Sequence, residues 1–316
     1  MEEEQVIINV EHLTKDYGYG RGVFDVSIKV HKGECYGYLG PNGAGKSTTI
    51  RHIMGFSKTS VGKVEILGQE TFGNTEKILE KVGYLPGEPA LPLYMNGWEF
   101  LRMMEEMRGN KNEEMLMHLI ELFKLDPSLS IKSMSLGDKR KLAVVSAFMN
   151  DPDILILDEP TSGLDPVMQK VFIDFIIEEK KRGKTILLSS HIFSEVDATC
   201  DTISIIKDGK HVSTFKAQDL KDMSKQTYVL HFLDKENMER YIKERNTFKL
   251  VETNDINLTA TIEFDRKDYK TFFSSLLGIK IKEFEEKPFT LQDYFMSFYK
   301  EEKEFGGLEG VKGNKK

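Results

Sequence analysis

The segment Gly40–Ser47, with the sequence GPNGAGKS, constrains the fold of this chain more than any other part of it. It has two glycines separated by four residues and followed by Lys and Ser, and it stands between the apolar run Cys35–Leu39 and a predicted helix. Glycines let the backbone wrap around a phosphate with N–H groups aimed inward, while Lys46 supplies charge to the β and γ oxygens and Ser47 can ligate Mg²⁺. A glycine turn before a helix can arise by chance, but this order of elements favours a phosphate-binding loop, which we name the phosphate loop.

A second signal is the apolar run Ile154–Leu157, which is followed directly by Asp158 and Glu159. A parallel strand presents the side chains at its carboxyl end to ligands of an open α/β sheet, so we expect Asp158 to hold Mg²⁺ there through water. Glu159 could orient or deprotonate an attacking water molecule. Two acids after a strand often cap a helix instead, but the phosphate loop upstream favours the functional interpretation.

Two further motifs follow in the order found in a known family. Ser162-Gly163-Leu164-Asp165 comes shortly after Glu159, and Ser190-His191 ends the strand-like run that begins at Thr185. With these motifs, residues 6–220 resemble the ATPase subunit of ABC transporters. The resemblance implies ATP hydrolysis with Mg²⁺ and an α/β fold of the P-loop NTPase type, with a mixed sheet and a helical subdomain.

The resemblance also implies roles for three residues whose own chemistry leaves alternatives. Tyr17 would stack on adenine, Asp165 would belong to a loop that contacts an opposite subunit, and His191 would reach the γ-phosphate as a catalytic residue beside Glu159. Taken singly, Tyr17 is an aromatic residue at a strand end, Asp165 a turn residue before Pro166, and His191 a polar cap for a helix near Phe193. Their order and spacing around the phosphate loop favour the family roles.

The stretch that corresponds to the signature motif of the family is Met134–Lys139, with the sequence MSLGDK. Ser135 and Gly137 fit the usual Leu-Ser-Gly-Gly-Gln pattern, and the Ser-Leu-Gly form resembles the antibiotic and peptide exporter branch. Asp138 departs from the pattern: it can join a helix cap with Ser135, but its carboxylate would also weaken the positive helix end that should meet a γ-phosphate. The expected nucleotide contacts are Tyr17, Gly40, Pro41, Asn42, Gly43, Ala44, Gly45, Lys46, Ser47, Thr48, Ser135, Gly137 and Asp165, with Ser47 and Asp158 as the Mg²⁺ ligands.

A second departure from the family pattern follows the predicted strand Val82–Leu85. The position at which the family places a glutamine that senses Mg²⁺ and the membrane partner is occupied by Gly87. Glu88 could replace that glutamine, or the loop could couple to a partner only mechanically. The sequence leaves both interpretations open.

Length and pattern predict two domains and a tail. A chain of 316 residues exceeds the usual size of one domain. We expect an ATPase domain over 1–222, with a helical subdomain at about 88–150, and an accessory α+β domain over 223–305. The accessory domain has the predicted order βαββαβ, which is compatible with a ferredoxin-like unit. Its end, Phe289–Met296, resembles the C-terminal extension of exporter ATPases. This accessory domain could add a dimer contact or regulate the ATPase, or it could be a passive appendage. Residues 306–316 are expected to form a flexible tail.

The net charge and the hydropathy of the chain disfavour nucleic acid as a ligand and a membrane-spanning segment. The net charge of −7 disfavours nucleic acid as a ligand. No apolar run approaches the roughly 20 residues of a membrane-spanning helix, and the acidic N-terminus lacks the features of a secretory signal, so we expect a cytoplasmic protein. Transport would therefore need a separate transmembrane permease, which would hold this chain at the inner face of the cell membrane.

The family resemblance implies a head-to-tail dimer, expected as a homodimer, that closes around two MgATP molecules. Through the permease it would export a drug, an antimicrobial peptide or a lipid-like substrate. A soluble ABC-type ATPase acting on ribosomes or DNA is the alternative, although the chain has one phosphate loop and no long coiled-coil insertion. A kinase or GTPase would not need Ser135 and Gly137, the Ser162–Asp165 loop or His191.

Overall fold

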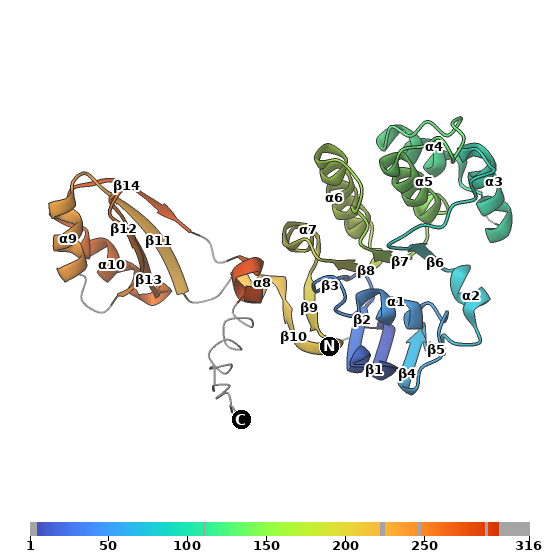
Figure 1. Ribbon diagram of the computed structural model, residues 1–316, viewed down its shortest axis with the longest axis horizontal. Helices are drawn as coiled ribbons and strands as arrows, with labels where there is room; N and C mark the ends of the chain where they lie inside the picture. Colours follow the sequence, from blue (N-terminus) through green and yellow to red (C-terminus); the bar gives the residue numbers. More distant parts are fainter. Residues whose placement is uncertain (1–4, 110, 222–224, 245–247, 288–289, 297–316) are drawn as a thin grey trace, which may run out of the picture. The chain divides into compact units, whose positions relative to one another are not determined.

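The chain divides into two compact units, Met1–Ala217 and Gln218–Lys316, in the computed structural model (Figure 1). The described residues are 5–109, 111–221, 225–244, 248–287 and 290–296. The division falls at the start of α8 (Ala217–Lys221), slightly ahead of the boundary after residue 222 that the sequence predicts. The predicted tail, residues 306–316, lies outside the described residues.

The first unit contains a mixed sheet with the strand order β5-β4-β1-β2-β10-β9-β3-β8-β7-β6. The strands β6-β7-β8-β3-β9 run parallel to their neighbours, whereas β2-β1-β4-β5 are antiparallel. The mixed sheet confirms the predicted fold class. The strand bounds are β1 Val6–Gly18, β2 Arg21–His31, β3 Cys35–Leu39, β4 Val61–Ile66, β5 Gln69–Glu70, β6 Val82–Leu85, β7 Ile154–Asp158, β8 Thr185–Ser190, β9 Thr202–Lys207 and β10 Lys210–Lys216.

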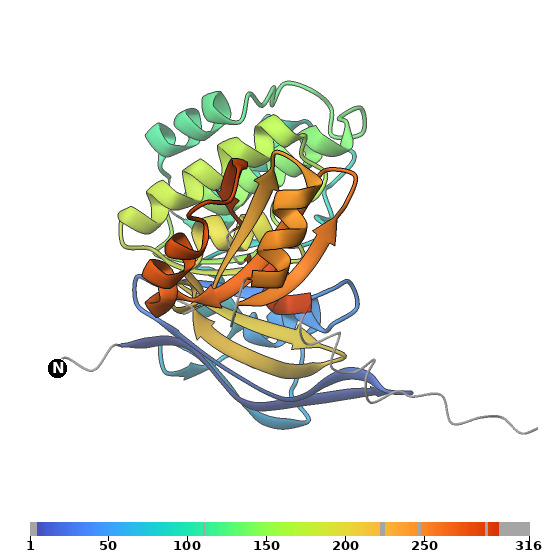
Figure 2. The same cartoon turned by 90° about the vertical axis from the view of Figure 1, so that its left-hand side faces the viewer.

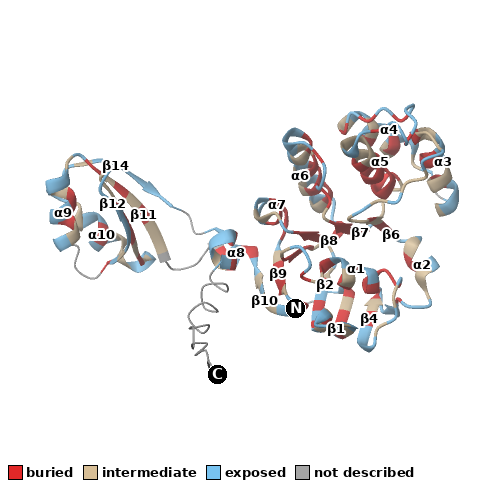
Figure 3. Ribbon diagram, viewed as in Figure 1, coloured by how far each residue is buried: buried red, intermediate tan, exposed pale blue. Residues whose placement is uncertain are grey.

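The central parallel strands are buried along their whole length. Every residue of β3, β7 and β8 is buried, and Figure 3 colours these strands red. Continuous apolar runs of this kind are typical of parallel strands that are covered on both faces. Helix α1 supplies one cover, because its Ile50 and Ile53 lie in the same core cluster as residues of both the parallel and the antiparallel strands. Loops at the carboxyl ends of these strands carry the predicted site.

The helices of the first unit are α1 Lys46–Ile53, α2 Thr75–Leu79, α3 Gly97–Arg108, α4 Glu113–Leu122, α5 Leu136–Phe148, α6 Pro166–Lys181 and α7 Phe193–Thr199. A capping box between Asn96 and Glu99 starts α3. Helices α4, α5 and α6 meet through four phenylalanines with edge-to-face or tilted rings, Phe123, Phe148, Phe172 and Phe175. This aromatic cluster fixes α5, the helix whose first turn contains part of the signature motif.

The first hairpin differs from its prediction. The sequence predicts a strand over Val6–Val10 and a glycine-rich connection over Gly18–Gly22, but β1 continues to Gly18 and β2 starts at Arg21. Figure 2 shows these two long strands in blue. Register shifts along the β1–β2 pair accommodate the polar middle of β1. As a result, Tyr17 lies on β1 beside the hairpin turn.

The second unit has the predicted order of elements. Its strands are β11 Lys225–Phe232, β12 Lys249–Asn254, β13 Thr259–Asp265 and β14 Ile281–Glu286, and its helices are α9 Lys235–Glu244, η1 Arg266–Asp268 and α10 Tyr269–Ser275. The strand order β12-β13-β11-β14, antiparallel throughout, is that of a ferredoxin-like split βαβ unit. One core cluster joins β11 and β13 to Met238 and Tyr241 of α9 and Phe272 of α10. Residues 291–296, within the segment compared above with the C-terminal extension of exporter ATPases, are helical.

No helix of the described segments combines the length and the apolar character needed to cross a membrane.

Candidate nucleotide site

The phosphate loop connects the buried end of β3 to the first turn of α1. Gly43 and Gly45 have φ angles of 81° and 107°, in the region where a side chain is strained, and Gly45 is the N-cap of α1. Gly40 is needed for space, because a Cβ there would lie 2.4 Å from the carbonyl oxygen of Ile206. The three glycines thus let the loop fold back tightly at the positive end of α1.

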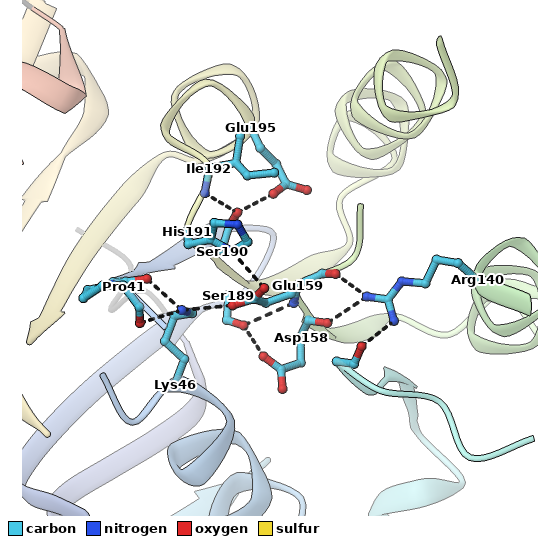
Figure 4. Close-up of polar contacts among 12 residues, drawn as sticks. Pro41, Lys46, Arg140, Asp158, Glu159, Ser189, Ser190, His191, Ile192 and Glu195 are labelled. Carbon is cyan, nitrogen blue, oxygen red and sulfur yellow. Dashed lines mark hydrogen bonds and ion pairs between the residues drawn. The ribbon is translucent and has the colours of Figure 1, made fainter. Parts of the chain in front are cut away.

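Lys46 is buried in the folded loop with its ammonium group at the edge of the site. Its Nζ donates hydrogen bonds to the carbonyl oxygens of Gly40, at 2.7 Å, and Pro41, at 3.1 Å. It also forms a 3.0 Å ion pair with Oε1 of Glu159 (Figure 4). A buried ammonium group held in this way is a fixed positive charge for an anionic ligand.

Asp158 and Glu159 stand where β7 ends. The Oδ1 atom of Asp158 accepts a hydrogen bond from the hydroxyl of Ser189, the residue paired with it on β8. The Glu159 backbone N–H donates to the Ser189 carbonyl oxygen at 3.0 Å. Glu159 has φ 46°, a left-handed conformation that is uncommon for a residue with a side chain. The chain thus turns sharply after β7 and sends the two carboxylates in different directions.

The Glu159 carboxylate lies between two cationic or polarisable groups. Its Oε1 pairs with Lys46, and its Oε2 lies 2.8 Å from Nδ1 of His191. Partial burial pushes the pKa of Glu159 upward, but the hydrogen bond and charge of Lys46, helped by His191, outweigh burial and hold the pKa below its ordinary value. Glu159 is therefore ionised at neutral pH, as a proton acceptor must be.

His191 contacts Glu159 and does not cap the helix after it. The first N–H of that region, from Ile192, donates to the hydroxyl of Ser190 at 2.9 Å. Ser190 in turn donates to the buried carboxyl of Glu195 on α7. Helix α7 has no side-chain cap hydrogen bond, so His191 does not act as its polar cap, and the imidazole contacts Glu159 instead.

Because of Glu195, the free energy of unfolding of this protein should decrease as the pH rises. Burial raises the pKa of its carboxyl from 4.5 to about 7, with Glu159 adding to the rise and Ser190 and Arg140 opposing it. The folded protein therefore binds a proton between pH 4.5 and 7 that the unfolded chain has lost, and up to about 3 kcal/mol of stability disappears across that window. Glu195→Gln, which is neutral at every pH, should match the wild type near pH 5 and exceed it at pH 8.

Urea unfolding of both proteins at pH 5, 6, 7 and 8 measures this difference. Asp197→Asn, an exposed carboxylate on the same helix, is the matched control and should show no comparable pH-dependent difference. A constant offset between Glu195→Gln and wild type at all four pH values would mean that Glu195 remains ionised in the folded protein.

A single cavity of about 960 Å³ collects most of the predicted contacts. Its lining includes Tyr17, Asn42, Gly43, Gly45, Lys46, Ser47, Thr48, Asp158 and Glu159. Gly40, Pro41 and Ala44 do not line it, although the first two hold Lys46 through their carbonyl groups. The ring of Tyr17 is exposed and has Lys15 Nζ 5.7 Å from its centroid. Tyr17 thus supplies an aromatic face in the same cavity as the phosphate loop.

Three further predicted nucleotide contacts, which lie on other helices, are also outside this cavity lining. Ser135 is the N-cap of α5: it accepts from the Asp138 backbone N–H at 3.1 Å and donates to Oδ2 of Asp138 at 2.7 Å. Gly137 lies in the first turn of the same helix, close to the carbonyl of Gly163. Asp165 caps α6 by accepting from the N–H groups of Val167 and Met168. The geometry assigns Asp138 to the cap and leaves the nucleotide contacts of all three as predictions.

The loop after β6 brings Gly87 and Glu88 to the cavity. Both residues line it, and a Cβ at Gly87 would lie 3.2 Å from Oδ2 of Asp158. A larger side chain at position 87 would therefore press on the Asp158 carboxylate. Glu88 is exposed to the cavity, so a role beside Asp158 and a purely mechanical role for this loop both stay predictions.

The oxygen donors around Asp158 fit Mg²⁺. Mg²⁺ prefers carboxylate, hydroxyl and water oxygens. Asp158 and Ser47 line the same cavity, and the hydrogen bond from Ser189 reaches only Oδ1 of Asp158. The sequence predicts Asp158 and Ser47 as the ligands, and the second carboxylate oxygen of Asp158 is the one that Ser189 does not contact.

Sequence reasoning missed several residues of the site. Ser189 and Glu195 orient Asp158 and the His191 segment, Asp208 and Gly209 line the cavity from the β9–β10 hairpin, and Arg140 binds the backbone beneath Glu159. Ser189 lies beside Asp158 only through the pairing of β7 with β8, which the sequence does not show. Arg140 stands between Lys139 and Lys141, so nothing in the sequence set it apart from its neighbours.

The chain matches the family model described as "ABC transporter" over residues 23–162. It is 31% identical over 297 residues to the bacitracin transport ATP-binding protein BcrA of Bacillus licheniformis, a match that covers 92% of this chain and 96% of that protein. It is 36% identical over 213 residues to Nod factor export ATP-binding protein I of Rhizobium leguminosarum bv. viciae, covering 66% and 68%. A solved structure of an ATP-binding subunit of an ABC transporter matches with a TM-score of 0.63 and 31% identity, covering 68% of this chain and 92% of that chain.

Proposed function

This chain belongs to the ATP-binding subunits of ABC transporters, and we propose that it forms a dimer around two MgATP molecules and drives export through a separate transmembrane permease. Its ATP-hydrolysing activity is that of the family. The similarity to BcrA covers most of both units. The proposal therefore applies to the whole chain, with the second unit as part of the transport machinery.

One observation carries the proposal: a single cavity is lined by most of the phosphate loop, by the two acids at the end of β7 and by Tyr17. Tyr17 would stack on adenine, and the loop would surround the phosphates with Lys46 on their β and γ oxygens. Glu159 would then take the proton of the attacking water through its carboxylate, with His191 holding that carboxylate from the other side. The ion pair of Lys46 with Glu159 has to open when Lys46 binds phosphate.

Mg²⁺ is proposed as the cofactor of this reaction. Ser47 and Asp158 would hold it, and it would supply positive charge against the phosphate oxygens. The contribution of the chain itself is to keep Asp158 oriented, through Ser189, and to keep the Glu159 carboxylate ionised.

A second copy of the chain would complete each site. Ser135, Gly137 and Asp165 do not line the cavity that contains the phosphate loop of the same chain. The N-terminus of α5 presents backbone N–H groups and a Ser hydroxyl that suit a phosphate. We therefore place it against the γ-phosphate bound by the opposite subunit, in a head-to-tail homodimer.

Export is the proposed direction, and a drug, an antimicrobial peptide or a lipid-like molecule the proposed class of substrate. Two relatives are named for bacitracin transport and for Nod factor export. The permease would hold this chain at the inner face of the cell membrane. A soluble role on ribosomes or DNA is the outcome that would oppose this proposal.

Co-purification from the native host tests the transport role. The tagged chain is recovered from membranes solubilised in mild detergent, and stoichiometric partners are identified by mass spectrometry. We expect a polytopic membrane protein that remains bound after a high-salt wash. Recovery with ribosomes, DNA or soluble proteins alone would leave the ATPase in place and overturn the exporter.

A further inference from the structure

Arg140 binds the backbone of both loops that lead to the site. It lies on α5, it is only 2% exposed, and its guanidinium donates to main-chain carbonyl oxygens from two separate segments (Figure 4). After β6, the carbonyl oxygens of Pro86 and Gly87 accept from Nη1 at 2.7 and 3.0 Å. After β7, the carbonyl oxygen of Pro160 accepts from Nε at 2.9 Å, and those of Asp158, at 3.1 Å, and Glu159 accept from Nη2. One side chain thus joins α5 to the loops after β6 and β7.

The chemistry of this contact requires arginine. Burial lowers the pKa of Arg140 to about 10, with the nearby charges of Asp158, Glu195 and Glu159 opposing the change, so the group remains a cation at neutral pH. A guanidinium offers five N–H donors in a rigid plane, whereas lysine offers three from one point. Carbonyl acceptors use these donors and leave the carboxylates of Asp158 and Glu159 available for the reaction.

Glu159 is the residue that needs such support. Its φ of 46° is a left-handed conformation, which is strained for a residue with a side chain. The peptide on its amino side is held by the Ser189 carbonyl, and the one on its carboxyl side by Arg140. Without Arg140 the backbone is free to leave this conformation, and the carboxylate would move away from Lys46 and His191.

We propose that Arg140 is a positioning residue for ATP hydrolysis, which holds the backbone of Glu159 so that its carboxylate faces the attacking water. The proposal rests on the proposed role of Glu159 as the base. It also gives a route by which movement of α5, whose first turn carries Ser135 and Gly137, would reach Glu159 directly.

The variants Arg140→Gln and Arg140→Lys test this role, because a positioning residue should affect kcat for ATP hydrolysis but not the Kd for ATP. The phosphate loop does not contact Arg140, so the Kd for ATP should stay within about threefold of wild type. Misplacing a catalytic group by about 1 Å costs about 10²-fold in rate, so kcat of Arg140→Gln should fall between about ten- and a hundredfold. Arg140→Lys keeps the charge and some donors and should recover part of that loss. A folded Arg140→Lys or Arg140→Gln protein with wild-type kcat would overturn the proposal.

A double-mutant comparison shows whether Arg140 acts through Glu159. Single-turnover hydrolysis is measured for wild type, Glu159→Gln, Arg140→Lys, Arg140→Gln and both combinations with Glu159→Gln. In the Glu159→Gln background, loss of Arg140 should slow hydrolysis by less than about twofold. An equal loss in both backgrounds would overturn the positioning role. Normal turnover of Glu159→Gln alone would instead overturn the proposed base, so the two failures differ.

Arg182→Gln is the matched control for loss of a structural arginine. Arg182 bonds Asp151 and Glu179 and does not line the cavity. Its loss should lower the unfolding midpoint without changing kcat. A fall in kcat of Arg140→Gln that Arg182→Gln reproduces at equal loss of stability would assign the effect to general destabilisation and overturn the proposal. If Arg140→Gln does not fold, Arg140→Lys alone carries both comparisons.

Discussion

A Glu159→Gln variant should bind ATP and hydrolyse it about a hundredfold more slowly than the wild-type protein. The amide keeps the shape of the side chain but cannot accept the proton of the attacking water. It also removes the ion pair that Glu159 makes with Lys46 and a negative charge near the phosphates. The Kd for ATP should therefore be equal to or lower than that of wild type.

Phosphate release and equilibrium ATP binding measure the two parts of this prediction. Because ATP is retained, light scattering with ATP present should show a dimer that persists in the variant. Glu178→Gln, which changes an exposed carboxylate on α6, is the control and should behave as wild type in all three measurements. Near-normal turnover of Glu159→Gln would show that another group takes the proton.

Lys46→Ala should weaken ATP binding by at least about tenfold. A hydrogen bond to a charged group contributes about 1.5 to 3 kcal/mol, and Lys46 is the buried cation of the phosphate loop. The substitution also leaves the Glu159 carboxylate without its cation, which adds repulsion toward the phosphates. Both effects act on binding itself, in contrast to Glu159→Gln.

Equilibrium titration with ATP measures the affinity, and a thermal unfolding midpoint shows whether the variant is folded. Lys180→Ala is a matched control, because Lys180, like Lys46, bonds backbone carbonyl oxygen and a carboxylate, here those of Thr199 and Asp201, away from the cavity lining. It should keep wild-type affinity. Unchanged ATP affinity in folded Lys46→Ala would contradict the assignment of the phosphate loop.

Much of the fold was predictable because its signals are local in the chain. Continuous apolar runs predicted the buried strands β3, β7 and β8, and the alternation of elements predicted the βαββαβ order of the second unit. The first hairpin was not predicted in full. Its polar middle, before Tyr17, has no apolar alternation, and it is a strand only because β2 and β4 pair with it.

In the candidate site, too, some residues could be identified from local sequence and others could not. Gly40, Gly43 and Gly45 are required by their own backbone angles or close contacts, so their spacing identifies the loop without knowledge of the fold. The acids at 158 and 159 are recognisable because a strand ends there. His191 could be assigned a role only by resemblance, since its contact with Glu159 joins residues 32 positions apart.

Local patterns in the chain were thus enough to identify the phosphate loop, the pair of acids at the end of β7 and the family to which the chain belongs. What holds these groups in place depends on contacts between segments that are distant in the chain. Ser189 faces Asp158 because β7 and β8 pair in one register, and Arg140 reaches Glu159 because α5 packs beside the ends of β6 and β7. The acceptors of Arg140 are backbone carbonyls, which every residue possesses, so no pattern of side chains in the sequence could have identified them.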